Sequence, residues 1–189
     1  GLSMSYVLSK HNVKHIVFER GHIAETWRSQ RWDSFALNTP GHMNILPGEI
    51  FENVSTQSFL LKDKVVNKLI NYAKKFQLPV HEKARVLSVT KTTGDEYFRV
   101  LVKRGEQMTE YLSRQLVVAS GAMNAAKIPP FGDKLSKEIY QIHVLGYRNA
   151  SQLPDGAVMV IGSGQSGCQV AEDLVSAGRK VYLSTSKVG

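Results

Sequence analysis

Apolar residues recur along this chain with periods that predict both helices and strands. Between residues 62 and 76 they form one face, made of Val65, Val66, Leu69, Ile70, Ala73 and Phe76. This spacing predicts an amphipathic helix that ends before Pro79. Residues 2–10 have a weaker helical spacing with Asn12 as its stop, and residues 14–19 form a short β-branched and aromatic run. The chain is therefore predicted to open with a helix that leads into a strand.

Three further runs predict strands, over residues 84–90, 97–103 and 111–119. The pairs Gly94-Asp95 and Arg104-Gly105 are turn signals that separate them. Consecutive strands joined by short turns pair in opposite directions, so these residues predict an antiparallel meander.

The last part of the chain predicts a strand over 157–161, a helix over 165–177 and a strand over 180–183. Strand, helix and strand in that order indicate a parallel βαβ unit. Two segments lack a clear period. Residues 21–58 predict a long ordered loop with one short helix, and residues 121–130 predict a linker; a loop as long as the first is usually functional. The pattern as a whole predicts an α/β protein with a central parallel sheet and an inserted antiparallel meander.

Composition narrows the class of protein. The chain has 189 residues, of which 42% are hydrophobic and 21% charged, enough for one large or two small domains. Its apolar runs are far shorter than the roughly 18 residues of a membrane span, and no signal-peptide pattern opens it. The single cysteine, Cys168, excludes an internal disulfide, a C-x-x-C pair and a thiolate-rich metal site. We therefore expect a cytoplasmic protein without a bound metal, whose redox chemistry would come from a cofactor.

The net charge of +8 would suit a nucleic acid, an anionic membrane or a phosphorylated small molecule. The basic residues are scattered and alternate with acids, as in a solvated surface, and no nucleic-acid-binding motif is present. We therefore expect no nucleic-acid or membrane partner.

Residues 162–167 read Gly-Ser-Gly-Gln-Ser-Gly, a G-x-G-x-x-G motif between the apolar run 158–161 and the predicted helix. In this context Gly162 permits the tight turn, Gly164 lets the backbone approach a pyrophosphate and Gly167 allows close packing of the helix. The helix N-terminus supplies N–H donors for the anion. The motif predicts a dinucleotide-binding site.

The start of the chain matches the part of this unit that follows its last glycine. When Gly1 is aligned with Gly167, helix falls on helix, strand falls on strand, and Glu19 stands at the end of the first strand. A carboxylate there accepts the hydroxyls of an adenosine ribose, so Glu19 predicts a nucleotide without a 2′-phosphate, such as FAD. On this interpretation the rest of the first fingerprint would precede residue 1. A surface acid after a strand is the alternative.

The second unit differs at the corresponding place. Ser184, Thr185, Ser186 and Lys187 follow the predicted strand without an acid among them, and Arg179 and Lys180 are close in sequence. Hydroxyl donors and a cation suit a 2′-phosphate, which a carboxylate would repel. We therefore predict NADPH in preference to NADH, with solvated surface charges as the alternative for Arg179 and Lys187.

These segments resemble the flavin-containing monooxygenases, including bacterial and plant-type members. The first helix and strand, with Glu19, resemble the FAD unit of that family. Residues 22–28 are similar to its Gly-Gly-x-Trp-Arg segment, although both glycines are replaced here. Residues 35–40, followed by 46–48, resemble the loop in which an Asn-Thr pair faces the isoalloxazine.

Two segments extend the resemblance towards the C-terminus. Residues 117–121, followed by Pro129, resemble the hinge between the FAD and NADPH domains, with Ser120 in place of Thr. Residues 143–148 match the His-x-x-x-Tyr half of the identifying motif. In this motif His143 is interpreted as either a hinge residue that senses NADPH or a packed core histidine.

The resemblance implies a Rossmann-like FAD/NAD(P)-binding fold with two dinucleotide-binding units, both incomplete in these residues. It divides the chain into a partial FAD-binding domain over 1–124, a hinge over 125–155 and the start of an NADPH-binding domain over 156–189. The C-terminal remainder of the NADPH domain and the segment that completes the FAD domain are expected to be absent.

The resemblance also implies an activity. In the family NADPH reduces FAD, and the reduced flavin takes up O2 to give a C4a-hydroperoxide that transfers one oxygen atom to a small nucleophilic or carbonyl substrate. Asn38 is the implied catalytic residue, beside the flavin ring, with an Asx turn before Pro40 as its alternative role. The residues expected to bind FAD or NADPH are Gly1, Glu19, Arg20, Trp27, Arg28, Asn38, Thr39, Val86, Ala119, Ser120, Gly121, Gly162, Gly164, Gln165, Ser166, Gly167, Ser184, Ser186 and Lys187. Core packing is the alternative for Trp27.

Two other functions stay open at this point. One is a flavin-dependent NAD(P)H reductase related to the pyridine nucleotide-disulfide enzymes, which share the two-fingerprint layout, although this chain has no cysteine pair. The other is a non-catalytic remnant that binds nucleotide. The expected partners are a small-molecule substrate and O2, with a homodimer as the assembly considered.

Overall fold

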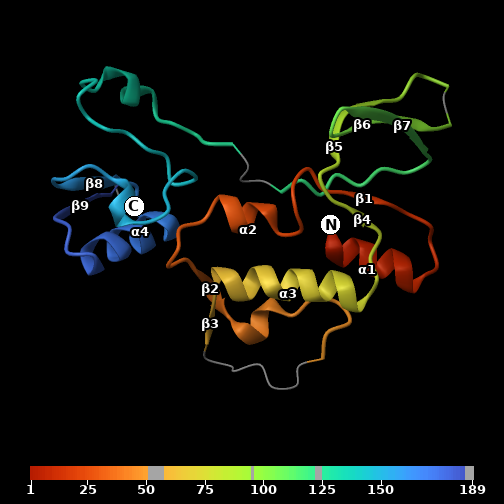
Figure 1. The fold of residues 1–189 in the computed structure, drawn as a ribbon, viewed down its shortest axis with the longest axis horizontal. Coiled ribbons are helices and arrows are strands. Elements are labelled where there is room, and N and C mark those ends of the chain that lie inside the picture. The colour runs from red at the N-terminus through yellow and green to blue at the C-terminus, as the bar shows by residue number, and fades with distance from the viewer. Residues whose placement is uncertain (51–57, 95, 122–124, 186–189) are drawn as a thin grey trace. The chain divides into compact units, whose positions relative to one another are not determined.

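The computed structural model describes residues 1–50, 58–94, 96–121 and 125–185 (Figure 1). The chain divides into two compact units. The first unit comprises Gly1–Glu25, Ile45–Glu52 and Val66–Ala122, and the second comprises Thr26–Asn44, Asn53–Val65 and Met123–Gly189. Each unit thus draws on separated parts of the sequence. The domain boundaries expected from the sequence stay a prediction.

The first unit contains a parallel strand pair next to a helical core. Helix α1 (Leu2–Lys10) leads to β1 (Val17–Phe18), which pairs in parallel with β4 (Val80–His81). Helix α3 (Lys62–Lys75), predicted from its apolar face, buries Tyr72 and Ala73 with Leu78 in this unit.

The end of α3 has a clear physical cause. Gln77 takes a left-handed φ of 49°, and the Leu78 N–H donates to the Ala73 carbonyl at 3.0 Å. This bond satisfies one of the last helical carbonyls and turns the chain away before Pro79, which could not continue the helix.

The first unit also contains the meander, as predicted. Its strands are β5 (Arg85–Thr90), β6 (Phe98–Arg104) and β7 (Gln107–Ser113), all paired antiparallel. Val100 and Val102 on β6 pack with Ala84 in a small core.

The predicted third strand, over 111–119, is displaced in the structure. Gly105 adopts a φ of 59°, so a two-residue turn brings Gln107 opposite Arg104 and pairing resumes at once. The ladder then ends where Ser113 meets Phe98, the first residue of β6. Residues 114–121 therefore lie outside any described strand, and the Val118 side chain is 81% exposed.

Residues 21–58 contain the expected short helix and also a strand that was not predicted. The helix is α2 (Glu25–Ser29), and it is followed by β2 (Ala36–Pro40) and a 3-10 turn, η1 (Gly41–Asn44). Strand β2 pairs antiparallel with β3 (Phe59–Leu61). The loop prediction was wrong for β2 because Asn38 and Pro40 are typical of turns, whereas the partner strand stabilises them in extended backbone.

The second unit also contains the predicted βαβ unit. Strand β8 (Val158–Ile161) leads through α4 (Gln165–Ser176) to β9 (Val181–Ser184), and the two strands pair in parallel from Val158↔Val181 to Ile161↔Ser184. Short 3-10 turns, η2 (Pro130–Lys134) and η3 (Ala150–Gln152), precede them. The core of this unit is built on four buried residues, Trp32, Tyr147, Val170 and Leu174.

The α/β class with parallel and antiparallel sheets is therefore confirmed. The expectation of one central parallel sheet is not met by the described strands, because the parallel strands occur as two separate pairs. Among the described helices, none is long and apolar enough to cross a bilayer.

Candidate dinucleotide-binding site

The three glycines of the fingerprint lie between β8 and α4, and each has the geometry expected of it. Gly162 has a φ of +106°, a conformation that favours glycine. A Cβ built on Gly167 would lie 1.8 Å from the Gly162 carbonyl oxygen, so only glycine fits there. A Cβ on Gly164 would meet nothing within 4 Å. The loop is thus tight at its first and last glycine and open at the middle one.

The open glycine stands at the N-terminus of α4. Gly164 is the N-cap residue, and no side chain caps the helix there. The first N–H groups of an α-helix have no intrahelical acceptor, so those of Gln165 and Ser166 are placed to donate to an anion. This is a cradle that a phosphate would fill and that a side chain at position 164 would obstruct.

The end of β9 lies beside this cradle. The Gly162 N–H donates to the Ser184 carbonyl at 3.0 Å, which brings two residues predicted to contact NADPH next to each other. Thr185 follows at the end of the strand, while Ser186 and Lys187 lie outside the described residues.

Arg179, expected near a 2′-phosphate, serves another purpose. Its guanidinium donates to the carbonyls of Ala150, Leu153, Pro154 and Gly156, in the segment that precedes β8. These bonds lie at the start of the strands, whereas a nucleotide would bind at their carboxyl ends. The expectation was therefore wrong for Arg179. The Lys180 ammonium lies 5.3 Å from the centre of the Tyr182 ring.

Glu19 lies where the alignment of the two units predicted it. It follows β1 directly, and its N–H donates to the His81 carbonyl at 3.0 Å on the parallel partner strand. Its Oε1 accepts the Gly21 N–H at 3.0 Å, and among the described residues Oε2 has no partner. The carboxylate therefore stands at the carboxyl end of a parallel pair with one oxygen available.

The other residues predicted in the first unit surround this strand end to different degrees. Gly1 precedes α1, and a Cβ on it would come within 4.0 Å of Val17 on β1. Arg20 is exposed. Val86 lies on β5, and the residue before this strand, Ala84, donates its N–H to the Glu19 carbonyl. The predicted hinge residues are Ala119, Ser120 and Gly121, which follow the meander outside any described strand.

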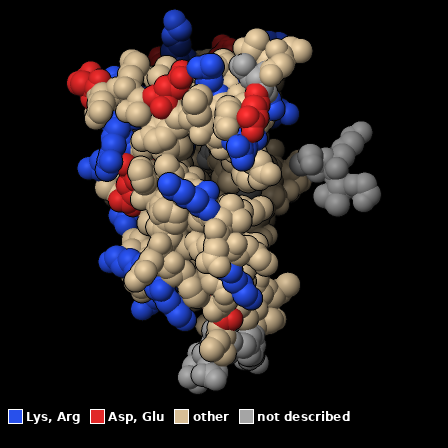
Figure 2. Space-filling model, turned by 90° about the vertical axis from the view of Figure 1, so that its right-hand side faces the viewer, with Lys and Arg blue, Asp and Glu red and all other residues tan. Residues whose placement is uncertain are grey.

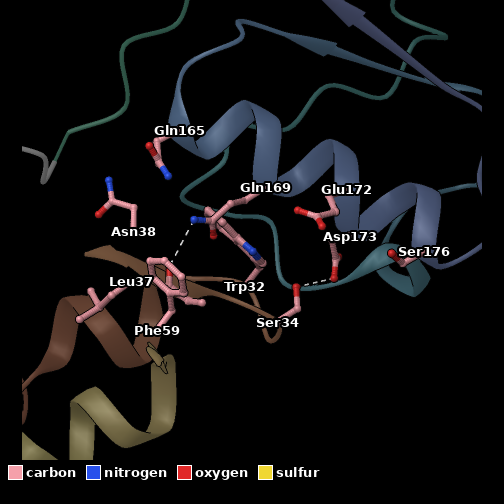
Figure 3. Close-up of a pocket in the computed structure, with 11 residues that line it drawn as sticks. Trp32, Ser34, Leu37, Asn38, Phe59, Gln165, Gln169, Glu172, Asp173 and Ser176 are labelled. Atoms are coloured by element: carbon pink, nitrogen blue, oxygen red, sulfur yellow. Dashed lines mark hydrogen bonds between the residues drawn. The ribbon is translucent and has the colours of Figure 1, made fainter. Parts of the chain in front are cut away.

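A cavity of about 590 Å3 in the second unit brings the predicted catalytic residue to the fingerprint helix (Figure 3). Asn38 from β2 and Gln165 from α4 line the same end of it. The remaining lining residues are Trp32, Ser34, Ala36, Leu37, Phe59, Gln169, Glu172, Asp173 and Ser176. The sequence predicted Asn38 and Gln165 separately, and the structure places them together.

Asn38 itself is exposed on β2, and the turn after this strand is closed by another asparagine. The Asn44 amide donates to the carbonyls of Thr39 and Pro40, and its Oδ1 accepts the Thr39 hydroxyl at 2.8 Å. These bonds run back to Thr39 and Pro40 and are not an Asx turn, so the Asx turn considered for Asn38 stays a prediction. Thr39, predicted to contact the flavin, is used to stabilise this turn.

Trp27 and Arg28 lie on α2. The Trp27 ring packs 5.6 Å from the Phe35 ring, and the Arg31 guanidinium lies 5.3 Å from the centre of the Trp27 ring. Burial lowers the pKa of Arg31 from its ordinary value. These contacts favour the packing role that was the alternative for Trp27, whereas Arg28 is exposed.

The face drawn in Figure 2 shows how the positive charge is distributed. Lys and Arg side chains are separated by acidic and uncharged residues and form no continuous tract. Among the described residues, no group of three or more His, Cys, Asp or Glu side chains is arranged to hold a metal ion.

A family model for the pyridine nucleotide-disulphide oxidoreductases matches residues 1–188. The chain belongs to this family. Relatives of the chain include an uncharacterised CzcO-like oxidoreductase of Geobacillus kaustophilus, 40% identical over 97% of the chain and 51% of that protein. The probable indole-3-pyruvate monooxygenase YUCCA1 of Arabidopsis thaliana is 28% identical over 97% of the chain and 44% of that protein. The chain thus spans about half the length of the curated relatives it matches.

Solved structures share the fold of this chain. A flavin-containing monooxygenase from Stenotrophomonas maltophilia matches with a TM-score of 0.84 and 24% identity, over 99% of the chain and 55% of that protein. The bacillithiol disulfide reductase Bdr from Bacillus cereus matches with a TM-score of 0.79 and 20% identity, over 100% of the chain and 56% of that protein. The predicted resemblance to flavin monooxygenases is thereby confirmed, in sequence by the plant relative and in fold by the bacterial structure.

Sequence reasoning missed several residues that line the cavity, Gln169 and Asp173 above all. Both recur at helical spacing from Gln165, on the same face of α4. That spacing was visible in the sequence, but the hydrogen bonds of these residues were not. Their partners are Ser34, Ala36 and Tyr147, which lie far away in the sequence. His143 itself is half-buried, and its Nδ1 accepts the Leu145 N–H at 3.2 Å.

Proposed function

We propose that the protein is a monooxygenase that uses FAD, NADPH and O2 to transfer one oxygen atom to a small nucleophilic or carbonyl substrate. The observation that carries the proposal is the glycine cradle at the head of α4, in a chain that is 28% identical to a probable monooxygenase. The family of pyridine nucleotide-disulphide oxidoreductases and the fold of a flavin-containing monooxygenase support the same pair of cofactors.

The nicotinamide dinucleotide would be held by the second unit. The cradle offers the N–H groups of Gln165 and Ser166 to the pyrophosphate, and Gly167 keeps α4 close to the strand. Ser184 lies beside Gly162 and would supply a hydroxyl to a 2′-phosphate, together with Ser186 and Lys187. The preference for NADPH over NADH rests on these hydroxyls and on the absence of an acid at this strand end.

FAD would be held through Glu19, whose Oε2 is available to ribose hydroxyls. When bound, the flavin supplies the redox chemistry and the reaction with O2. The residues of this chain would orient the bound flavin and exclude water from it. Asn38 lines the cavity together with Gln165. Its side-chain amide N–H would donate to an oxygen of the flavin ring or of the nicotinamide carboxamide there.

The first experiment asks which cofactor the purified protein carries. The protein is heated, and the released small molecules are identified by mass spectrometry. Release of FAD, together with O2 consumption that depends on NADPH and yields an oxygenated product, is the expected result. A protein that binds no flavin and oxidises no NADPH would overturn the proposal and favour the non-catalytic alternative.

A second candidate function is a flavin-dependent disulphide reductase, favoured by the family and by the fold of the bacillithiol disulfide reductase. Reduction through a protein cysteine pair requires a second thiol, and these residues contain only Cys168, whose Sγ donates to the Ser163 carbonyl at 3.3 Å. Anaerobic NADPH oxidation with a low-molecular-weight disulphide separates the two functions. A reductase would proceed without O2, and a monooxygenase would stop after one flavin equivalent.

A further inference from the structure

One face of α4 is polar and lines the cavity, whereas the opposite face is buried. The cavity side carries Gln165, Gln169 and Asp173 at successive turns (Figure 3). The buried side includes Val170 and Leu174, and Leu174 has no exposed surface. The helix is therefore anchored by its apolar face, and its polar face can serve as a fixed reference for whatever contacts it.

Asp173 uses both carboxylate oxygens on this face. The Ser34 hydroxyl donates to Oδ1 at 2.5 Å, and the Tyr147 hydroxyl donates to Oδ2 at 2.5 Å. Tyr147 is 2% exposed, so the tyrosine end of its bond to Asp173 is shielded from water, whereas the bond from Ser34 is exposed. Hydrogen bonds to a carboxylate in such surroundings are stronger than bonds between neutral groups.

The two residues that bond to α4 across the cavity, Ser34 and Ala36, closely precede Asn38 in the sequence. Ser34 bonds Asp173, and the Gln169 amide, one turn earlier on the helix, donates to the Ala36 carbonyl at 3.2 Å. Ala36 and Asn38 alternate along β2 and so share one side of the strand, and Ser34 lies in the turn directly before it. The two contacts therefore fix the approach of β2 directly before Asn38.

A second set of bonds restrains the same segment. Asp33 accepts from the Lys62 ammonium at 3.0 Å and from the Asn149 amide at 2.7 Å. These two hydrogen bonds lower the pKa of Asp33, the Asn149 bond most, so the carboxylate stays charged. Residues 33 and 34 are thus held both by α4 and by the segment that carries Tyr147.

We propose that Asp173 is a positioning residue: by accepting from Ser34 and Tyr147 it fixes β2 against α4 and so sets the separation of Asn38 from Gln165. This inference rests on the proposed function, because the separation matters only if Asn38 and Gln165 contact the reacting nucleotide. Asp173 itself needs no contact with cofactor or substrate.

The test compares variants that remove one bond each, Ser34→Ala, Tyr147→Phe and Asp173→Asn, in the purified protein with its cofactors. The matched controls are Asp155→Asn and Tyr182→Phe, which change exposed residues of the same unit away from the cavity. The first readout is the side-chain amide resonance of Asn38 in a 15N–1H spectrum, assigned by its loss in Asn38→Asp. We expect it to shift in the three variants and to stay in place in the controls.

The second readout separates positioning from folding. Misplacing a reacting group by about 1 Å can lower the rate by about 100-fold, so kcat should fall by about 10-fold to 100-fold. The dissociation constant for NADP+ should change by less than about twofold, because the glycine cradle is untouched, and Ser34→Thr should restore kcat by restoring the hydroxyl. An unmoved Asn38 resonance, or a loss of kcat only in proportion to unfolded protein, would overturn the inference. A wild-type protein that oxidises no NADPH would instead reject the proposed function, while the Asn38 resonance would still report on positioning.

Discussion

The two helices that begin near glycines, α1 and α4, have the same backbone plan and different chemistry at the strand that follows. Helix α1 ends at Lys10 and α4 ends at Ser176, the same number of residues after Gly1 and after Gly167. Each leads to a strand with a parallel partner, β1 or β9. At the end of β1 stands the Glu19 carboxylate, and at the end of β9 stand two hydroxyls, Ser184 and Thr185.

The buried positions of the two helices differ as well. Ser5 in α1 is 1% exposed and hydrogen-bonded to His15 Nε2 at 2.7 Å, whereas α4 has Ala171 at the equivalent place. A buried hydroxyl is tolerated because its partner satisfies it. The comparison teaches that the backbone plan is shared by the two units, whereas the residues at the strand ends differ in charge. The proposed preference of one unit for FAD and of the other for NADPH rests on that difference.

The largest expected effect comes from closing the tight end of the fingerprint. Gly167→Ala forces a methyl group against the Gly162 carbonyl, which lies 1.8 Å away and belongs to the backbone, so α4 must move. We expect the free energy of unfolding to fall by about 3 kcal/mol and NADPH binding to be lost in isothermal titration calorimetry. Gly164→Ala is the matched control, since its methyl meets no atom within 4 Å. It should fold with wild-type stability and still bind NADPH weakly; equal losses of stability would contradict the difference between the two glycines.

The next effect tests the chemistry of the strand ends. Ser184→Asp gives the second unit the carboxylate that the first has in Glu19. Because a carboxylate repels a 2′-phosphate and accepts ribose hydroxyls, the ratio of NADPH to NADH affinity should fall by about 10-fold, equivalent to about 1.4 kcal/mol. Steady-state KM values for both coenzymes measure the ratio. Ser184→Asn, which adds bulk without charge, should leave the ratio within a few-fold of wild type, and an equal change in both variants would refute a charge effect.

A third effect compares two buried tyrosines, one in each unit. Burial and the hydrogen bond to Asp173 raise the pKa of Tyr147 well above its ordinary value of 10.0. Burial, with smaller contributions from Tyr6 and Glu49, raises the pKa of Tyr72, whose hydroxyl donates to the Pro47 carbonyl at 2.7 Å. Above about pH 10 the unfolded chain releases these protons and the folded protein retains them, so stability should fall as the pH rises.

Tyr147→Phe should remove the larger part of this alkaline loss and Tyr72→Phe the smaller part, as measured by denaturant unfolding between pH 8 and pH 11. At neutral pH, Tyr147→Phe should cost about 2 kcal/mol, because its partner is charged, and Tyr72→Phe about 1 kcal/mol. A reversed order in the alkaline loss would contradict the role assigned to Asp173.

The smallest effect concerns Arg179. Arg179→Gln removes most of the donors to the carbonyls before β8, so the free energy of unfolding should fall by about 1 kcal/mol. The preference for NADPH over NADH should not change, because the guanidinium is occupied at the other end of the strands. A loss of NADPH preference would restore Arg179 to the nucleotide site.

Local patterns were sufficient for part of this structure. The period of α3, the turn at Gly105 and the strand-turn-helix context of the fingerprint each lie within a few residues, and each was predicted. Strand β2 was missed because its partner β3 is more than a dozen residues away and its own residues are typical of turns. The third strand of the meander was predicted too late in the sequence, because its position was inferred from an apolar run. Its actual bounds are set by pairing with β6, from Gln107 opposite Arg104 to Ser113 opposite Phe98, which the sequence alone does not show.

The same distinction applies to the candidate site. Gly162, Gly164 and Gly167 could be identified because their spacing between a strand and a helix is typical of a dinucleotide-binding turn. Glu19 could be identified because the two units can be aligned. Asp173 carries no such signal, since its hydrogen-bond partners lie 139 and 26 residues away in the sequence. The same holds for Arg179. The sequence shows a cation close to the predicted NADPH-binding residues, and only the fold shows that its guanidinium donates to carbonyls before β8.

The hydrogen bonds of Arg179 lie at one end of the β8–β9 pair, and the contact between Gly162 and Ser184 lies at the other. One guanidinium joins the segment before β8 to the turn before β9, and a backbone hydrogen bond joins the two carboxyl ends. Each end of the pair therefore has its own contacts, and a substitution at Arg179 leaves those between Gly162 and Ser184 in place.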